Sequence, residues 1–396
     1  MSKAAVVIGR NYCVCLGVIR ALGLAGYKVS VLRLLHSYDG DKSPEIASKY
    51  VEKVAQVSLD DEGAIIPALI ESFSDPENKA LVFSAGDDLV ASLIDKNHER
   101  LSKYFLIPSV DETPGELLRC MDKGVQKQIA RKCGFYAADG VTIEIDNNGC
   151  YSIPDAIPFP CYVKPQVSFG SPKSYIKKCE TKEELSELLD DISKHGSNTI
   201  LVEEYLPIEK EYVIPGASCG GKAIIPAFIE KKRIGSGAHK GVTGSGIVID
   251  SADIPELKYK LCRLIEEVDL NGLFDVEVIF SGGKYYFNEL NLRYGAAGYA
   301  ITAAGVNLPA IFADYVLDGV IQEPTPICTG VTFVNEKVVF DDCRNGYIPW
   351  REYKNDIKSA DIRFIYSKDD PKPYKIYRVM VIKARIRRLI NKLLKR

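Results

Sequence analysis

The sequence predicts a mixed fold class: a parallel α/β unit at the N-terminus, followed by an α+β unit with antiparallel strands. Apolar runs at 4–8 and 27–34 enclose a helical stretch that ends at Gly26, and the same strand–turn–helix order returns over 81–97. Such alternation is typical of a parallel sheet covered by helices. Beyond residue 160, short apolar runs follow one another with turn residues between them, which is typical of an antiparallel sheet.

The other elements follow in chain order. Residues 9–17 read as the turn after the first strand, and 117–135 as one helix closed by Gly134. Thr181 and Glu184 have the spacing of a capping box, which predicts a helix start there. The sequence further predicts strands at 160–166, 175–179, 199–207, 211–218 and 222–230, a helix at 255–270 and a hairpin at 274–292.

The composition is that of a globular protein with two or three domains. The chain has 396 residues, of which 46% are hydrophobic and 26% charged, so it can form more than one core. It holds no run of about 18 apolar residues and starts without the features of a signal peptide, which predicts a cytoplasmic protein. The 11 cysteines include no CxxC pair and are expected to be reduced.

The net charge of −2 is unevenly distributed. Residues 374–396 hold nine Lys and Arg and no acid, and subtracting these nine charges leaves −11 on the first 373 residues. A body this acidic argues against nucleic-acid binding. The tail predicts a basic amphipathic helix, with three alternatives open: contact with the inner face of an anionic membrane, packing on the acidic body, or a frayed end. Its apolar residues at helical spacing are Val379, Ile382, Ile386, Leu389, Ile390 and Leu393.

Three polar residues alternate with leucines at the end of the predicted hairpin. Glu289, Asn291 and Arg293 lie two apart and therefore share one face of a strand. One interpretation is a half-buried strand whose polar face is solvated. The other is a functional site, because the strand runs into the glycine-rich stretch 295–298 and Glu277 precedes it on the other strand.

The register of the hairpin separates these interpretations. A turn of two residues, Gly282-Gly283, pairs Glu277 with Asn288 and leaves Glu289 on the other face. A turn of three residues places Glu277 opposite Glu289, and this is the register that we predict. Two facing carboxylates repel each other unless a cation lies between them, and such oxygen ligands suit Mg²⁺. The sequence therefore predicts a magnesium site above a three-residue turn.

Two loops are candidates for binding the other reactants. Lys164 follows an apolar strand, and the small-residue loop 168–174 comes next, where backbone N–H groups can approach phosphate oxygens. An ordinary turn is the alternative reading. The loop 231–246 is rich in Gly and Lys; either it covers the acceptor side, with His239 and Lys240 binding a carboxylate, or it is a surface loop.

The order of these motifs resembles that of the ATP-grasp superfamily, in particular its carboxylate–amine ligases, to which D-aspartate ligases belong. Lys123, the VKP strand with its Ser/Gly loop, LVEEYLPIEKEYVI, and an acid about a dozen residues before NELNLR follow one another in that order. The similarity covers most of residues 1–325. It implies a Rossmann-like N-terminal domain at 1–115, an ATP-grasp domain at 116–325 with a lid subdomain at about 160–205, and a C-terminal extension at 326–396.

The resemblance also implies a role for each matching residue. Leu292 departs from the family pattern, which often has proline between the asparagine and the arginine. The implied roles are phosphate contacts for Lys123 and Lys164, a lid for Ser168, Gly170 and Ser171, the adenine hinge for Glu203, Glu204 and Leu206, the ribose contact for Glu211, ligation of two Mg²⁺ (or Mn²⁺) for Glu277, Glu289 and Asn291, and catalysis for Arg293 and Lys164.

The activity implied by the resemblance is ATP-dependent ligation of a small carboxylate to a small amine. The carboxylate attacks the γ-phosphoryl group, and the amine then displaces phosphate from the acyl phosphate. An amino acid or a cell-wall-type peptide is the expected substrate, and a homodimer stays open. The alternatives are an ATP-grasp enzyme of nucleotide or bicarbonate-activating metabolism, and a non-catalytic ATP-binding scaffold. Against the scaffold argues the retention of the polar residues Lys164, Glu277, Glu289, Asn291 and Arg293.

Overall fold

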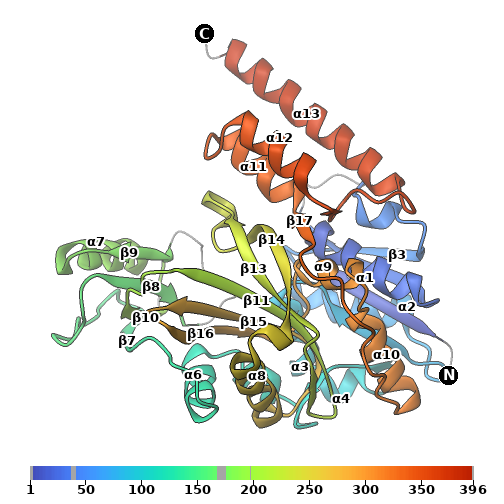
Figure 1. The fold of residues 1–396 in the computed structure, drawn as a ribbon, viewed down its shortest axis with the longest axis horizontal. Coiled ribbons are helices and arrows are strands. Elements are labelled where there is room, and N and C mark those ends of the chain that lie inside the picture. Colours follow the sequence, from blue (N-terminus) through green and yellow to red (C-terminus); the bar gives the residue numbers. More distant parts are fainter. Residues whose placement is uncertain (1–2, 37–41, 167–174, 197, 395–396) are drawn as a thin grey trace.

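The computed structural model describes residues 3–36, 42–166, 175–196 and 198–394. The N-terminal part is a five-stranded parallel sheet in the order β3-β2-β1-β4-β5, with helices packed against it (Figure 1). The predicted parallel α/β unit is therefore confirmed. Its elements are β1 (Ala4–Gly9), α1 (Tyr12–Leu24), β2 (Lys28–Leu35), η1 (Glu45–Ala47), β3 (Val51–Ser58), η2 (Glu62–Ala64), α2 (Ile65–Phe73), β4 (Ala80–Ser84), α3 (Asp88–Lys96), α4 (His98–Leu101) and β5 (Phe105–Leu106).

The first helix begins earlier than the sequence indicated. The predicted turn over 9–17 is wrong beyond Asn11, whose side chain accepts a hydrogen bond from the Cys13 N–H at 3.1 Å and caps α1. The helix therefore begins at Tyr12. Strand β3 was not predicted at all; half of its side chains are exposed and none is fully buried, so the strand has no clear buried face.

The stretch predicted as one helix over 117–135 is broken into two. Helix α5 (Glu116–Arg119) ends before α6 (Lys123–Lys132) begins. Asp122 accepts a hydrogen bond from the Val125 N–H at 3.0 Å and so starts a new helix. This cap fixes Lys123 in the first turn of α6.

A small antiparallel sheet follows, in the order β7-β10-β8-β9, with one helix packed on it (Figure 1). Thr181 accepts from the Glu184 N–H, so the predicted cap of that helix is confirmed. The sheet starts before residue 160, where the lid subdomain was expected to begin. Its elements are β7 (Gly140–Ile145), β8 (Cys161–Pro165), β9 (Lys177–Cys179), α7 (Lys182–Ser193) and β10 (Asn198–Glu204).

The large sheet has nine strands. Seven follow the order β16-β15-β11-β13-β14-β17-β18, and the other two pair at its side, β12 with β11 and β6 with β15. One apolar core joins it to the N-terminal sheet, since Val7 and Leu81 belong to the same cluster as Val213 and Ile229. Its remaining elements are β6 (Ser109–Val110), β11 (Lys210–Cys219), β12 (Lys222–Ile224), β13 (Ala227–Ile234), η4 (Gly237–His239), β14 (Thr243–Asp250), η5 (Ser251–Asp253), α8 (Pro255–Val268), β15 (Leu270–Ser281), β16 (Lys284–Asn291), α9 (Gly298–Ala303) and α10 (Leu308–Asp318).

The β15–β16 hairpin has the predicted pairing but not the predicted turn. The turn contains two residues, because Ser281 pairs with Lys284 and both glycines have positive φ angles of 55° and 74°. The prediction of a three-residue turn is therefore wrong. A β-bulge takes up the difference: Val278 pairs with Phe287, the next pair is Glu277 with Glu289, and Asn288 is the extra residue. The bulge thus returns the two glutamates to facing positions.

The C-terminal segment is tied to both earlier parts. Strand β17 (Thr332–Val334) pairs antiparallel with β14, and β18 (Ile362–Arg363) pairs parallel with β17. The buried Arg20 of α1 donates to Asp370 at 3.1 Å and to the carbonyl oxygens of Phe364 and Ile365. The other elements are α11 (Glu336–Asn345), α12 (Trp350–Ser359) and α13 (Lys372–Leu394).

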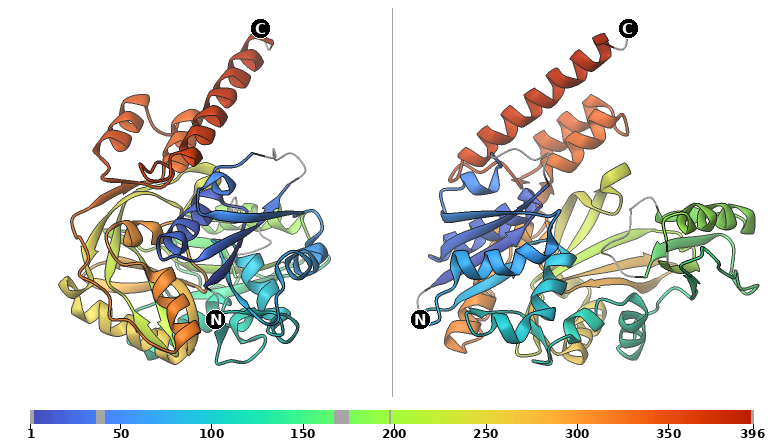
Figure 2. Two further views of the ribbon diagram at one scale, coloured as in Figure 1. Left: turned by 90° about the vertical axis from the view of Figure 1, so that its right-hand side faces the viewer. Right: turned by 180° about the vertical axis from the view of Figure 1, so that it is seen from behind.

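The predicted basic helix is present as α13 and projects away from the body toward the C-terminus (Figures 1 and 2). The beginning of the helix packs against α1 and Ile365 through Tyr374, Tyr377 and Val381. No helix in the described ranges has the length and apolarity needed to cross a membrane.

Candidate active site

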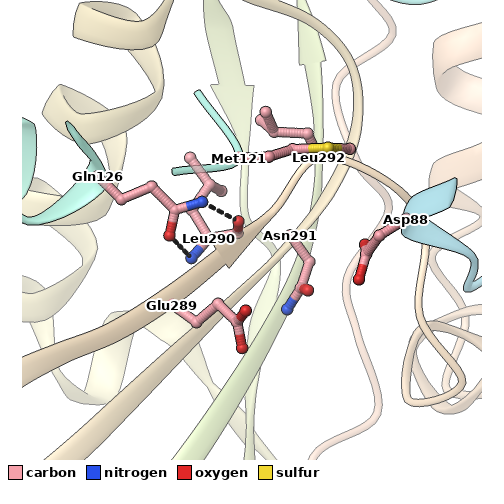
Figure 3. Close-up of a pocket in the computed structure, with 7 residues that line it drawn as sticks. All are labelled: Asp88, Met121, Gln126, Glu289, Leu290, Asn291 and Leu292. Carbon is pink, nitrogen blue, oxygen red and sulfur yellow. Dashed lines mark hydrogen bonds between the residues drawn. The ribbon is translucent and has the colours of Figure 1, made fainter. Parts of the chain in front are cut away.

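One glutamine holds the polar end of strand β16 in place. The side-chain amide of Gln126, on α6, donates to the Leu290 carbonyl oxygen at 2.7 Å and accepts from the Leu290 N–H at 3.0 Å (Figure 3). It also donates to the Cys120 carbonyl oxygen at 2.8 Å and is buried. Leu290 lies between Glu289 and Asn291, so this clamp fixes the backbone that carries both polar side chains. A small cavity here is lined by Asp88, Met121, Gln126 and residues 289–292.

Two lysines approach the hairpin from different elements. Lys123 of α6 forms an ion pair with Glu289, with 3.2 Å between Nζ and Oε1. Lys164 of β8 donates to Asn288 Oδ1 at 3.2 Å and forms an ion pair of 2.9 Å with Glu203. Glu203 is buried and also pairs with Lys127. Lys123 and Lys164 therefore meet at the bulged end of the hairpin.

A third lysine lies between two carboxylates. Lys231 of β13 forms ion pairs with Glu211 of β11 and, at 3.2 Å, with Glu277 of β15, and its side chain is fully buried. Burial raises the pKa of Glu211 although Lys231 opposes this shift. The two carboxylates hold the pKa of Lys231 above its usual value in spite of burial. The lysine is therefore charged, and it compensates two acids that would otherwise repel each other.

An arginine joins the hairpin to helix α3 of the N-terminal part. Arg293 donates to Asn291 Oδ1 at 3.0 Å and to Asp88 of α3 at 2.9 Å. Asp275 lies opposite Asn291 and is deeply buried, and burial raises its pKa to about 7 while Arg293 works against this. A Cβ atom at Gly295 would clash with the Asp275 carboxylate, which explains the glycine that follows the polar strand.

Burial also affects the lysine at the centre of the site. It lowers the pKa of Lys164 to about 8, although the carboxylates of Glu289 and Glu277 favour its charged form, and the charge of Lys123 adds to the lowering. A nearby anionic group such as a phosphate would stabilise the charged form of this lysine and so raise its pKa again.

The remaining predicted residues lie around this centre. Glu204 is partly buried, and its carboxylate accepts from the Asp139 N–H at 3.1 Å; Leu206 lies in the loop after β10. Ser168, Gly170 and Ser171, and with them the whole predicted lid loop 168–174, fall outside the described residues.

The stretch 231–246, predicted as one loop, is the end of the β13–β14 hairpin, because residues 231–234 belong to β13 and 243–246 to β14. The connecting loop between these strands makes contacts with the protein itself. His239 lies 2.9 Å from Asp341 of α11, and Lys240 donates to the Ile176 carbonyl oxygen of the small sheet at 2.7 Å. The loop therefore spans the space between the small sheet and the C-terminal segment.

Four functional candidates were missed by the sequence reading: Gln126, Lys127, Lys231 and Asp88. Each acts through a partner more than 15 residues away in the chain, such as Leu290, Glu203 or Arg293. The one local signal was the sequence Gly86-Asp87-Asp88, which leads from β4 into the first residue of α3.

The chain was compared with known proteins. It is 23% identical over 320 residues to a D-aspartate ligase from Enterococcus faecium (strain Aus0004), which covers 74% of this chain and 72% of that protein. Its fold matches an N5-carboxyaminoimidazole ribonucleotide synthetase (purK) in complex with ADP, with a TM-score of 0.64 and 17% identity over 87% of this chain and 85% of the other. The chain has the ATP-grasp fold, and the resemblance to that superfamily is confirmed.

A second ATP-grasp structure agrees with this assignment. An L-amino acid ligase from Bacillus licheniformis matches 82% of this chain and 75% of that one, with 17% identity and a TM-score of 0.56. No family model matches the chain. The predicted fold and enzyme class, an ATP-grasp ligase that forms C–N bonds, are confirmed.

The hairpin residues fit the magnesium ion that ATP-grasp enzymes use with ATP. Within the described ranges no three His, Cys, Asp or Glu side chains gather as a metal cluster. The oxygen donors that the hairpin offers are two glutamates and one amide. Glu277 and Glu289 face each other, and Asn291 follows on the same face. Next to them, Asp275 Oδ1 is buried with no hydrogen-bond partner among the described residues. An all-oxygen donor set of this kind suits Mg²⁺.

Proposed function

We propose that this ATP-grasp protein couples an amino acid carboxylate to an amine, with ATP as the second substrate. The observation that carries the proposal is the meeting of Glu277, Glu289 and Asn291 with Lys123 and Lys164 at one end of the β15–β16 hairpin. The oxygens suit a divalent cation and the lysines suit phosphate groups. Both are needed where a nucleoside triphosphate donates its terminal phosphoryl group.

The proposed reaction has two steps. A carboxylate oxygen attacks the γ-phosphorus of ATP, the bond between the β–γ bridging oxygen and that phosphorus breaks, and ADP leaves. The amine nitrogen then attacks the carbonyl carbon of the acyl phosphate, the carbon–oxygen bond to phosphate breaks, and the nitrogen loses a proton to solvent. Charge spreads over the transferring oxygens in the first step, so positioned cations are the main source of catalysis.

Within this proposal the chain's residues divide the work. Lys164 and Arg293 stabilise the phosphoryl group in transfer, and two Mg²⁺ ions, for which Mn²⁺ substitutes, would neutralise the phosphates. The other proposed contacts are Lys123 with phosphate, Glu203, Glu204 and Leu206 with adenine, Glu211 with ribose, Ser168, Gly170 and Ser171 as the lid, and Glu277, Glu289 and Asn291 with the metal ions.

The substrate class is chosen from the relatives. The D-aspartate ligase of Enterococcus faecium and the L-amino acid ligase of Bacillus licheniformis are both named for amino acid substrates. We therefore place a free amino acid, with D-aspartate first, on the carboxylate side and an amino acid or peptide amine on the other. We also propose that the protein forms a homodimer. Analytical ultracentrifugation measures the oligomeric state.

The test is a screen for ADP and phosphate release. Purified protein with ATP and Mg²⁺ is offered single amino acids of both configurations as carboxylates, with pools of amino acids and short peptides as amines. We expect release that depends on both partners, together with an amide product of the correct mass. Glu289→Gln is expected to abolish this release, and Glu267→Gln, on the exposed side of α8, is the matched control that retains it.

Each other outcome identifies an alternative. Release that requires bicarbonate and no amino acid would replace the proposal with a bicarbonate-activating enzyme. Tight ATP binding without release for any carboxylate or amine would favour a scaffold. Full activity of Glu289→Gln would remove the assigned metal site.

A further inference from the structure

Helix α13 has an anchored root. The Tyr377 ring is 5% exposed and packs with Cys13 and Leu16 of α1 and with Ile365. Its hydroxyl group donates to the carbonyl oxygen of Glu336 at 2.9 Å. The direction of the helix is therefore set by the body, and it is not a frayed end at this point.

Beyond the root, the helix exposes an apolar stripe. Val379, Ile382, Ile386 and Ile390 are 51%, 48%, 50% and 48% exposed. Their spacing of three, four and four residues places them along one side of a helix over roughly 16 Å. Large aliphatic side chains in such a row are a surface that soluble proteins normally cover.

The same helix is strongly basic. It contains eight Lys and Arg and no acid, while the remainder of the chain is acidic. Even so, the helix projects away from the body instead of lying along it (Figures 1 and 2). Packing on the acidic body, one of the alternatives drawn from the sequence, therefore describes only the root.

We propose that the outer part of α13 docks on the surface of an anionic lipid membrane, with its apolar stripe among the acyl chains and its basic residues among the headgroups. An exposed aliphatic row flanked by Lys and Arg is the pattern of a helix that lies in the membrane interface. A second copy of the helix is a poorer partner, because eight positive charges on each would repel along the contact. The anchored root would make the whole enzyme dock in one orientation.

The experiment is co-sedimentation of the full-length protein with lipid vesicles. Vesicles of neutral phosphatidylcholine are compared with vesicles that also contain phosphatidylglycerol. We expect binding to the anionic vesicles alone, weakened by added salt because the attraction is partly electrostatic. Replacing Ile382, Ile386 and Ile390 together by serine is expected to lower the vesicle affinity by about tenfold or more.

Two further variants make the result specific. Leu24→Ser combined with Val320→Ser removes equally exposed apolar side chains elsewhere and is expected to bind as the unchanged protein does. A second triple variant, Lys375→Gln with Arg378→Gln and Lys383→Gln, keeps the apolar stripe. We expect it to lose the part of the vesicle affinity that depends on salt. ATP-dependent activity in solution and the unfolding temperature should be unchanged in all of them.

Three results would overturn the proposal. The first is failure of the unchanged protein to bind anionic vesicles. The second is full binding by the triple serine variant. The third is a concentration-dependent dimer in solution that the triple serine variant abolishes, because the stripe would then be an interface between copies of this chain.

Discussion

The candidate active site and the outer part of α13 both concentrate lysine and arginine, but they place the opposite charges differently. In the site, Lys123, Lys164 and Lys231 each lie within 3.2 Å of a carboxylate oxygen of the same chain. In α13 the eight cations have no acid on their own helix. The site is therefore organised by its own counter-charges, whereas helix α13 contains none.

Burial adds to this difference. Removing one member of a buried ion pair leaves a charge that neither water nor a partner stabilises, and this costs much more than the loss of an exposed side chain. We therefore expect substitutions in the site to affect both folding and activity, and substitutions on the outer helix to affect only what the helix binds.

The largest effect is expected at Lys231. Lys231→Met leaves the buried Glu211 beside the partly buried Glu277 without their cation, which should lower the free energy of unfolding by about 3 kcal/mol. Urea unfolding followed by circular dichroism measures this value. The matched control is Lys232→Met, the next residue, whose lysine is half exposed and which should change stability by less than about 0.5 kcal/mol. Equal losses in both variants would mean that the buried pairs carry no special weight.

A smaller but broader effect is expected at Gln126. Gln126→Leu leaves the N–H and carbonyl groups of Leu290 without their partner, which should cost about 2 kcal/mol of stability. Because Glu289 and Asn291 flank Leu290, kcat should also fall by about tenfold. Steady-state kinetics with the substrate pair found in the screen measures this fall. Gln128→Leu, on the exposed side of the same helix, is the control and should leave both quantities unchanged.

The hairpin shows which structural features the sequence could predict and why the turn and the bulge could not be predicted. Alternation identified Glu289, Asn291 and Arg293 as one face, and the pairing of Glu277 with Glu289 is confirmed. The reason given for it, a three-residue turn, was wrong. A two-residue glycine turn and a bulge at Asn288 compensate each other, and a bulge leaves no mark in a simple apolar–polar pattern.

The partners of the site residues were equally hidden. Lys231 reads as one of several basic residues before a glycine-rich loop, and only the pairing of β13 and β15 with β11 brings it to Glu211 and Glu277. Gln126 reads as an ordinary polar residue in a helix. Buried polar contacts depend on tertiary packing, so local pattern cannot reveal them.

The affinity for ADP is expected to depend on pH through Lys164. Its lowered pKa of about 8 means that it is charged below pH 8 and loses its charge above it, at a pH where an ordinary lysine is still protonated. Only the charged form attracts phosphate, so the dissociation constant for ADP should rise from pH 8 to pH 9 by up to about tenfold. Isothermal titration calorimetry at constant ionic strength measures it. Lys164→Arg keeps the charge at every such pH and should flatten the curve; an unchanged slope would assign the effect to another group.

The smallest expected effect is a difference in the free energy of unfolding between a variant at the root of α13 and one in its outer part. Tyr377→Phe keeps the ring in the core and removes only the hydrogen bond to Glu336, which should cost about 1 kcal/mol of unfolding free energy. Ile386→Ser removes a side chain that is 50% exposed, and should change stability by less than about 0.5 kcal/mol. Thermal and urea unfolding of the two variants in the absence of lipid gives both values. A cost for Ile386→Ser as large as that for Tyr377→Phe would mean that the outer stripe already has a protein partner in solution, so that the contrast between a self-compensated site and an uncompensated helix would no longer hold.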